Sequence, residues 1–340
     1  MSFKYSNKKQ KKLIEKAQQL IEERGKRPLE MVRKAVLEEK IESKEAMEAL
    51  NYFMTECWND MARPTLLSIC CEAVGGDPDV SIPFAVPLSI ISGALDIHDD
   101  IIDKSKIKRD RLTVYGKYGE ETAILVADAL LFKGFTLLHK ACTQISTEKA
   151  TKIMEIIKKM FYELGDAEAM ELKLRKRLDI KSKEYLHIIE KKSADVEALA
   201  RIGAILGNGS IHEIEMLGNY GRNLGMLIIL GDDLMDTFNE RELKHRIKYE
   251  HLPLSVLYAF EASTLKKEMI RIFQKREITR KNIQIIMETV EKAEGFNRLA
   301  ILIQKILKKT KFHIRNIEKK SALNLFLHST LAPFQDFIGL

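Results

Sequence analysis

The sequence predicts an all-α protein, and three observations lead to that class. Apolar residues recur at three- and four-residue intervals, as in EKATKIMEIIKKMFYELGDAEAMELKL (148–174) and SADVEALARIGAILG (193–207). No proline occurs between Pro87 and Pro253. Runs that alternate β-branched and polar residues, as half-buried strands do, are few. We therefore expect a helical bundle.

Helix boundaries are predicted where glycine, proline and small polar residues gather. These places are RGKRP (24–28), GGDPDVSIP (75–83), YGKYGE (115–120), GNGS (207–210) and HLP (251–253). The chain shows no internal repeat, linker or low-complexity segment. We expect residues 1–340 to form a single helical domain, with residues 1–50 forming N-terminal helices that pack on the core.

Composition excludes several classes of protein. Hydrophobic residues make up 45% of the 340 residues, enough for a large core. The four cysteines show no metal-ligand spacing, which suits a reducing compartment. No signal segment and no run of 18 apolar residues is evident, so we expect a cytoplasmic protein. The net charge of +7 comes from scattered bases, without the basic and aromatic stripe of nucleic-acid binding.

Two acidic clusters interrupt apolar segments with the same internal spacing. Asp99, Asp100 and Asp103 lie in ALDIHDDIIDKSKIKRD (94–110), and GDDLMD (231–236) contains Asp232, Asp233 and Asp236. A helix turns about 100° per residue, so the acids of DDxxD lie on one side, within roughly 100° of each other. Carboxylates gathered on a buried face repel each other and lose hydration, so they require cations.

The alternative interpretations are an exposed acidic helix face with caps and a ferritin-like di-iron site. A repeated motif in apolar helices, followed each time by basic residues, argues against the first. The second needs Glu and ExxH ligands on paired helices, which this sequence does not contain. Ligands that are all oxygens favour Mg²⁺ over Mn²⁺ or Ca²⁺, and we expect two or three ions.

Magnesium retains waters and pairs with phosphates, so two facing clusters could clamp a diphosphate between several ions. Diphosphate bound in this way is a good leaving group, because the metals stabilise the charge that develops on its oxygens. The apolar flanks, LSIISGALDI and GMLIILG, would house a hydrocarbon chain. Together these features indicate ionisation of an allylic prenyl diphosphate.

From about Arg63 to near the C-terminus, the chain resembles the trans-isoprenyl diphosphate synthases, the polyprenyl synthetase family. The resemblance rests on motifs: HDDIID (98–103) and DDLMD (232–236) resemble the two aspartate-rich motifs, and YLHIIEKKSA (185–194) resembles YLxxIxxKTA. TVYGKYGEETAILVADALLF (113–132) and KKSALNLFLHSTLAPF near the end are similar to further family segments. The resemblance implies an isoprenoid synthase fold, a helical bundle around a deep central cavity, usually in a homodimer.

The resemblance also implies roles for particular residues. Six aspartates would bind magnesium: Asp99, Asp100, Asp103, Asp232, Asp233 and Asp236. Lys192 and Lys108 would contact the allylic diphosphate, and Ser193 would line the pocket near the reacting carbons. Arg63 and Arg109 would help to bind a second substrate, isopentenyl diphosphate. A basic pair at the surface is the alternative interpretation of Lys108 and Arg109.

The chain departs from the family pattern on the side of the second substrate. Asp60 stands where the family has a lysine that grips isopentenyl diphosphate, and Ser92 stands where it has His or Gln. Replacing a lysine by an aspartate reverses a charge that faces a diphosphate, at a cost of about a few kcal/mol. The acceptor is therefore either isopentenyl diphosphate or, given the altered pocket, a non-diphosphate acceptor such as an aromatic compound.

Three further residues near the first motif suggest a mechanism and a chain length. Asp96 occupies a usually apolar position, and we hypothesise that it acts as a general base or stabilises a carbocation. Alternatively, the Asp96 carboxylate is structural and is hydrogen-bonded to a neighbouring helix. Leu95 and Ala94 correspond to the floor of the family's cavity, and the small Ala94 leaves room for a chain of C20 or longer.

Two other functions remain open from the sequence. A terpene-synthase-like lyase would ionise the diphosphate without an acceptor, and a non-catalytic subunit of a heteromeric synthase would need an active partner. Retention of both aspartate motifs argues against the second. A long lipid product would also bring the enzyme into peripheral contact with a membrane.

Overall fold

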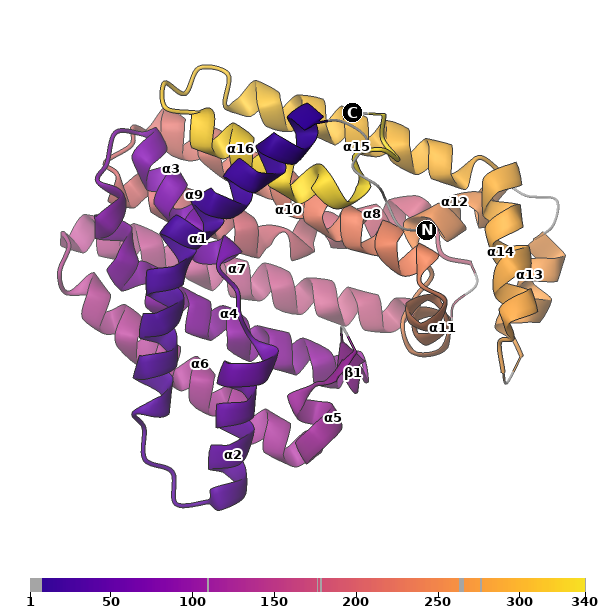
Figure 1. The fold of residues 1–340 in the computed structure, drawn as a ribbon, viewed down its shortest axis with the longest axis horizontal. Coiled ribbons are helices and arrows are strands. Elements are labelled where there is room, and N and C mark those ends of the chain that lie inside the picture. The colour runs from indigo at the N-terminus through magenta and orange to yellow at the C-terminus, as the bar shows by residue number, and fades with distance from the viewer. Residues whose placement is uncertain are drawn as a thin grey trace.

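The protein is an all-α bundle, as predicted (Figure 1). The structure, a computed structural model, describes residues 8–108, 110–175, 177, 179–262, 266–275 and 277–339. In that part of the chain the strands are limited to one antiparallel hairpin of two residues a side.

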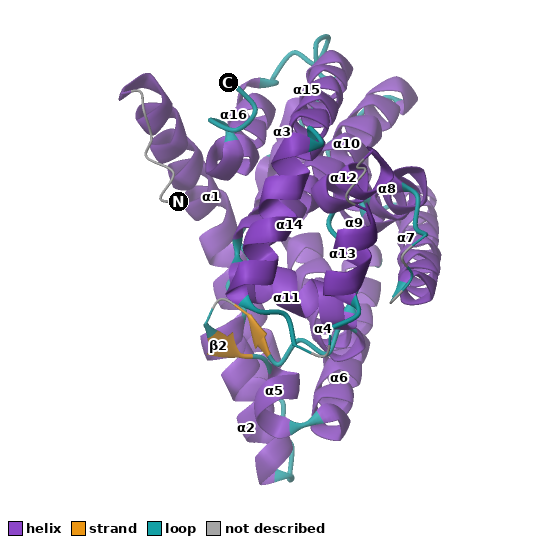
Figure 2. Ribbon diagram, turned by 90° about the vertical axis from the view of Figure 1, so that its right-hand side faces the viewer, coloured by secondary structure: helices purple, strands orange, loops and turns teal. Residues whose placement is uncertain are grey.

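The N-terminal third carries the first aspartate cluster at the end of a long helix. Its elements are α1 (Lys8–Leu37), α2 (Lys44–Tyr52), the π-helical turn η1 (Phe53–Cys57), α3 (Ala62–Ala73), the 3₁₀ turn η2 (Pro78–Ser81) and α4 (Ile82–Ile102). The hairpin of β1 (Ile107–Lys108) and β2 (Arg111–Leu112) follows, and Ile107 pairs with Leu112. This hairpin lies at the same end of the bundle as α5 and α11 (Figure 2).

The rest of the chain is helical. Its elements are α5 (Val114–Tyr118), α6 (Glu120–Cys142), α7 (Thr147–Leu174), α8 (Ser182–Lys192), α9 (Ala194–Leu206), α10 (Ile211–Phe238), α11 (Glu240–Tyr249), α12 (Leu254–Ala262), α13 (Lys266–Phe273), α14 (Arg280–Lys292), α15 (Gly295–His313), α16 (Ser321–Leu331) and η3 (Ala332–Phe334). In Figure 1, α4, α7 and α10 run through the bundle, and α11 lies near one end of them.

Four of the five predicted boundaries are confirmed. Gly119 has a φ of 86°, which a glycine adopts without strain, and it separates α5 from α6. The segments 75–83, 207–210 and 251–253 likewise separate α3 from α4, α9 from α10 and α11 from α12. The boundary at 24–28 is wrong, because α1 continues through Pro28. Pro28 is buried, and α1 packs on α3, α4 and α16, so tertiary packing compensates for the lost backbone hydrogen bond.

Helix α4 lies between two hydrophobic clusters. Leu88 and Ile91 belong to the larger cluster, which includes residues of α3, α7, α9, α10 and α12, whereas Ile90 and Ile97 belong to one formed with α1, α2 and α6. Because α4 is packed on both sides, the position of its C-terminal turn is fixed. That turn carries the first aspartate cluster.

A glycine brings α10 close to the junction between α8 and α9. A Cβ atom built on Gly225 would lie 2.7 Å from the Cβ atom of Ser193, closer than real side chains approach. The glycine therefore permits a contact that any larger residue would prevent. This contact places α10, which carries the second aspartate cluster, beside Ser193 and the end of α8.

Two segments, Pro78–Ile102 and Glu120–Cys142, are long and apolar enough to cross a membrane by length and composition alone. The first is a core segment, since 67% of its most apolar window is buried inside the bundle. In the second only 33% of that window is buried, so α6 presents apolar side chains outward.

Candidate active site

The first aspartate cluster forms the last turn of α4 and is held by two basic residues. The ammonium Nζ of Lys108 lies 2.6 Å from Asp100 Oδ1 and 3.3 Å from Asp99 Oδ2. Asp103 is the C-terminal cap of α4, and Arg175 donates from Nη2 to its Oδ1 over 3.0 Å. The hairpin and the end of α7 thus supply the cations that face these carboxylates.

Within the second cluster, Asp233 is fully buried and its oxygens already accept three donors. The hydroxyl of Tyr185 donates to Oδ1 over 2.9 Å, and the backbone N–H of Leu254 donates to Oδ2 over 2.6 Å. Arg246 Nη1 lies 2.7 Å from Oδ1. Direct ligation of a metal by Asp233 would require the loss of these contacts, so in this structure Asp233 orients α10 rather than facing an ion.

The other two aspartates of the second cluster are more accessible. Asp232 is exposed, and Asp236 is partly exposed, with Oδ2 3.3 Å from Arg246 Nη1. Arg246 therefore supplies one positive charge to a cluster of three acids. Helix α11 carries this arginine because the segment after the second motif folds back at Asn239, whose side chain caps α11.

Helix α11 also connects the two clusters. His245 Nε2 lies 3.0 Å from the carbonyl oxygen of Asp103 and 3.3 Å from Glu250 Oε1. Glu250 Oε2 in turn lies 3.5 Å from Arg246 Nε. The last turn of α4 is thereby joined to the arginine that contacts the second cluster.

Lys192, predicted to contact a diphosphate, lies between two acids of α7. Its Nζ atom is 2.9 Å from Glu168 Oε1 and also pairs with Glu171. Burial opposes the charge on Lys192, but Glu171, Asp99 and Glu168 raise its pKa well above the ordinary value. Lys192 is therefore a stable cation beside the first cluster.

A buried histidine completes this network. His251 Nε2 lies 2.6 Å from Glu171 Oε1, and its Nδ1 lies 3.1 Å from the carbonyl oxygen of Leu252. Arg246 Nη2 also lies 3.4 Å from both ring nitrogens, so His251 joins Glu171 to the arginine of the second cluster. Although burial alone would raise the pKa of Glu171, Lys192 and His251 hold it well below its usual range.

The carboxylates of the two clusters are short of positive charge. Burial raises the pKa of Asp100 to about 6, with Lys108 opposing the shift. Burial likewise raises the pKa of Asp236 to about 6, and Arg246 opposes it. For Asp103, burial and then the charge on Asp99 raise the pKa to about 8. Additional cations would favour the ionised form of all three groups.

The donor set fits magnesium, although the side chains are not arranged around an ion. Among the described residues, no group of three His, Cys, Asp or Glu side chains converges closely enough to hold a metal. The available donors at both clusters are carboxylate oxygens, which Mg²⁺ prefers. The ammonium of Lys108 between Asp99 and Asp100 shows that a cation is accommodated there.

Arg63 lies among three carboxylates from three elements. Its Nη1 is 2.8 Å from Asp60 Oδ2, its Nη2 is 3.5 Å from Asp96 Oδ1, and its Nε is 3.5 Å from Asp195 Oδ2. Trp58 donates from Nε1 to Asp96 Oδ2 over 3.3 Å. The structure thus shows Asp96 bonded to neighbouring elements, with 43% of its side chain still exposed.

The remaining predicted residues lie at different depths. Ala94 is fully buried in the cluster with α1, α2 and α6, whereas Leu95 is partly exposed and packs against the other cluster. Ser193 is fully buried, and its hydroxyl donates to the carbonyl oxygen of Ile189 over 2.7 Å. Arg109 lies outside the described residues.

Sequence reasoning missed Arg175, Arg246, His251, Glu168 and Glu171. The two arginines and the histidine lie in segments where charged residues are common, and no spacing separated them from surface residues. For Glu168 and Glu171, the sequence did contain a pattern that could have identified them. They stand three residues apart on an amphipathic helix, a spacing that places both on one face.

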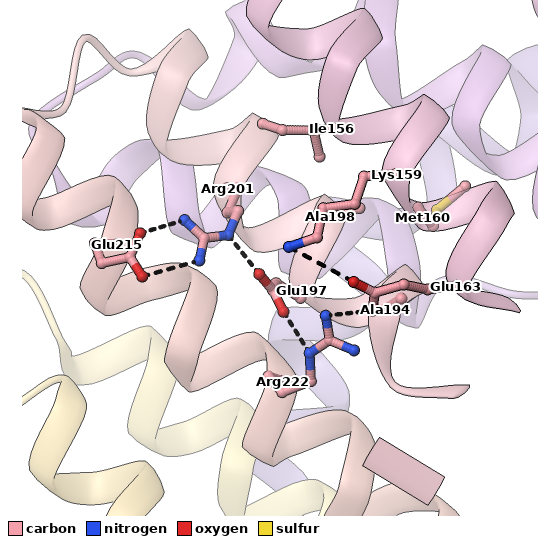
Figure 3. Close-up of a pocket in the computed structure, with 10 residues that line it drawn as sticks. All are labelled: Ile156, Lys159, Met160, Glu163, Ala194, Glu197, Ala198, Arg201, Glu215 and Arg222. Carbon is pink, nitrogen blue, oxygen red and sulfur yellow. Dashed lines mark hydrogen bonds and ion pairs between the residues drawn. The ribbon is translucent and has the colours of Figure 1, made fainter. Parts of the chain in front are cut away.

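A cavity of about 340 Å³ between α7, α9 and α10 is separate from these clusters (Figure 3). Its charged side chains pair with each other. Arg201 lies 2.6 Å from Glu197 and 2.8 Å from Glu215, and Arg222 pairs with Glu197 and lies 2.7 Å from Glu163. This cavity is consequently not a candidate for the diphosphate.

Two long helices that carry acidic clusters at one end of an all-helical bundle define the isoprenoid synthase class. Residues 44–290 match the family model of polyprenyl synthetase, and the chain belongs to that family. Membership places it among the prenyltransferases, as the aspartate motifs predicted.

Individual relatives agree with this assignment. The chain is 30% identical to the geranylgeranyl diphosphate synthase of Methanosarcina mazei over 244 residues, 70% of this chain and 74% of that one. The structure of the geranylgeranyl pyrophosphate synthetase of Pyrococcus horikoshii superposes with a TM-score of 0.82 at 26% identity, covering 98% and 100% of the two chains. A polyprenyl synthase of Caulobacter crescentus, solved with calcium and isoprenyl diphosphate, shares the fold (TM-score 0.77, 20% identity, 92% and 97% covered).

Substitutions at the adjacent Asp232 and Asp233 distinguish a role in binding the diphosphate headgroup from a role in stabilising the fold. We expect Asp232→Asn to leave the free energy of unfolding within about 0.5 kcal/mol, because the residue is exposed. Turnover should fall roughly 100-fold or more, because charge stabilisation of the leaving group is lost. Asp233→Asn should cost roughly 3 kcal/mol, because the buried Arg246 loses the nearest of its three carboxylate partners. Equal destabilisation in denaturant melts would contradict this division.

The raised pKa values predict how pH affects the metal-free protein. Carboxyls that titrate at about 6 and about 8 in the folded state, against about 4 unfolded, favour folding while protonated. The melting temperature without metal should therefore fall as pH rises from 5 to beyond 8, and the increase caused by Mg²⁺ should grow. Calorimetry of wild type and Asp103→Asn tests this, and a magnesium effect that is independent of pH would contradict it.

Proposed function

We propose that this protein is a Mg²⁺-dependent prenyltransferase that ionises an allylic prenyl diphosphate of C20 or longer and joins the prenyl group to an acceptor. The observation that carries the proposal is that helix α11 joins the two carboxylate clusters at one end of the bundle. His245 contacts the carbonyl oxygen of Asp103, and Arg246 contacts Asp233 and Asp236. A charged headgroup binds at that end, and the prenyl chain extends between α4 and α10. The proteins named above as geranylgeranyl diphosphate synthases support an allylic prenyl diphosphate as the class of substrate, and their names give C20 as the length of their product.

Each carboxylate cluster has a part in holding the headgroup. Asp99, Asp100 and Asp103 would hold magnesium on one side, and Asp232 and Asp236 on the other. Bound magnesium supplies neutralisation of the charge that develops on the leaving diphosphate. Lys192 would bind the same diphosphate directly, and Lys108, which pairs with Asp99 and Asp100, would contact its phosphate oxygens. Asp233 keeps α10 and Arg246 in position.

The transfer requires one bond to break and one to form. The C1–O bond of the donor breaks, and its electron pair leaves with the diphosphate. An electron pair of the acceptor then forms a bond to C1, and the acceptor loses a proton to the released diphosphate or to Asp96. Burial raises the pKa of Asp96, although Arg63 opposes the shift, and a raised pKa suits a base that works near neutrality.

The prenyl chain has an apolar route away from the headgroup. Leu95 on α4 and Ile228 and Ile229 on α10 are only partly buried, although each lies within a turn or two of an aspartate cluster. Exposed apolar surface of this kind beside a charged site suits a hydrocarbon chain. Ala94 is fully buried in the other hydrophobic cluster, with α1, α2 and α6, so the length of C20 or longer rests on the small size of this side chain at the family's cavity floor.

The acceptor is isopentenyl diphosphate, the usual partner in this family, or a non-diphosphate acceptor such as an aromatic compound. The surroundings of Arg63 favour the second, because three carboxylates already surround that guanidinium. An enzyme without an acceptor, a lyase, would share this feature. Its products differ, since a lyase releases a hydrocarbon or alcohol from a single substrate.

We further propose a homodimer that acts in the cytoplasm and makes peripheral membrane contact through its long product. Helix α6 carries Leu125 and Phe132, which are 66% and 79% exposed, and Ile124, which is 38% exposed. A helix face this apolar needs a partner in a soluble protein. A second copy of the same face is the simplest cover, since most soluble oligomers are symmetric.

Incubation of the purified chain with prenyl diphosphates tests the enzymatic proposal. We expect release of diphosphate from geranylgeranyl diphosphate in Mg²⁺, slower release from the farnesyl and geranyl compounds, and none in EDTA. Mass spectrometry with and without isopentenyl diphosphate identifies the products. Failure to cleave any donor under these conditions would contradict the proposal and favour a non-catalytic subunit, and Asp232→Asn is the matched inactive control.

A charged substitution on α6 tests the dimer. Phe132→Asp should convert a dimer to a monomer in sedimentation velocity, because a buried aspartate loses its hydration. Phe312→Asp on α15 is the matched control, since Phe312 is 53% exposed and lies on another helix. A wild type that sediments as a monomer would contradict the proposed dimer.

A further inference from the structure

We propose that Asp60, Asp96 and Asp195 determine acceptor specificity: they hold Arg63 in an ion-pair cluster and make this side of the active site reject a second diphosphate. The acceptor is consequently a phosphate-free compound, neutral or positively charged. This inference rests on the prenyltransferase function proposed above and names the class of its second substrate.

The cluster adjoins the donor site through two elements. Asp96 lies on α4 three residues before Asp99, about one helical turn away. Asp195 lies in the first turn of α9, three residues after Lys192. A molecule that approaches the donor from this side therefore meets the carboxylates of both elements. Their side chains are 43% and 21% exposed, so they can contact such a molecule.

The charges of the cluster do not suit an anion. Arg63 provides one positive charge, against three negative charges on residues whose atoms lie 2.8–3.5 Å from it. Burial opposes the charge on Arg63, but Asp96, Asp60 and Asp195 raise its pKa well above the ordinary value. A diphosphate would have to take the guanidinium from these carboxylates while being repelled by them.

Within the part of the chain that the structure describes, two neighbouring lysines are also engaged. Lys108 pairs with Asp99 and Asp100, and Lys192 pairs with Glu168 and Glu171. Both lysines face the carboxylates of the donor site, so a donor headgroup with its ions recruits them first. A neutral or cationic acceptor needs no such cation and gains from the surplus carboxylates.

A purely structural role for the cluster makes a different prediction. Asp60 precedes Met61, the N-cap residue of α3, and its Oδ1 accepts from the first backbone N–H groups of the helix, those of Ala62 and Arg63, over 2.8 and 3.2 Å. Asn caps helices about as well as Asp, so Asp60→Asn removes the charge and keeps the cap. If the cluster only stabilises the fold, this variant changes the free energy of unfolding but not the relative affinities for the two ligands.

Calorimetric titration of the holoprotein distinguishes these roles. The protein is first saturated with Mg²⁺ and geranylgeranyl thiolodiphosphate, a donor analogue that ionises slowly. Isopentenyl diphosphate is then titrated, and in parallel 3-methyl-3-buten-1-amine, which has the same carbon skeleton with an ammonium in place of the diphosphate. The proteins are wild type, Asp60→Asn, the Asp60→Asn/Asp195→Asn double variant, and a double control, Asp79→Asn/Glu215→Gln.

We expect the double variant to shift the ratio of the two affinities toward isopentenyl diphosphate by about 10-fold or more, and Asp60→Asn alone to shift it part of the way. The double control should leave the ratio unchanged, because Asp79 and Glu215 are 71% and 60% exposed and contact other residues. Thermal melts confirm that each variant is folded.

Two results would overturn the assignment. The first is that wild type binds isopentenyl diphosphate more tightly than the amine. The second is that the double variant leaves the ratio of the two affinities unchanged, and absence of binding in every protein counts as this result. Binding of the thiolodiphosphate is measured first. Its failure would count against the proposed function, whereas lost discrimination with an intact donor site would count against the acceptor class alone.

Discussion

The gathering of buried carboxylates at one end of the bundle is the constraint on which the rest of the site depends. Asp100, Asp103 and Asp236 have raised pKa values because burial removes their hydration and neighbouring acids repel them. The protein offsets part of this cost with basic side chains from other elements, and ions bound with a diphosphate would offset the rest. The short hairpin, the end of α7 and helix α11 can all be understood as supports for these bases.

The donor side of the site and the side around Arg63 differ in their balance of positive and negative charge. On the donor side, lysines and arginines face acids that an incoming headgroup and its cations can share. Around Arg63 the acids outnumber the base and surround it, so little positive charge remains for a ligand. This difference makes transfer of a long prenyl group to a phosphate-free acceptor a coherent hypothesis for a chain that otherwise follows its family.

Much of this could be predicted from sequence, and the remainder has physical reasons. Periodicity and glycine positions predicted the helices, but not the passage of α1 through Pro28, because packing on three other helices outweighs a local preference. Spacing predicted that each DDxxD motif would share a helix face. It could not distinguish Asp233 from Asp232, because Tyr185 and Leu254, the partners that occupy Asp233, are distant in the chain. Asp60 was recognised as a reversed charge, yet its pairing with Arg63 required coordinates.

A crystal structure of the protein with Mg²⁺ and geranylgeranyl thiolodiphosphate tests the central claim most directly. We predict ions between the diphosphate and the carboxylates of Asp99, Asp103 and Asp232, with Lys192 on the same headgroup and Arg63 still paired with its acids. A headgroup bound away from these aspartates, or aspartates that turn to bulk solvent while the donor is bound, would contradict it.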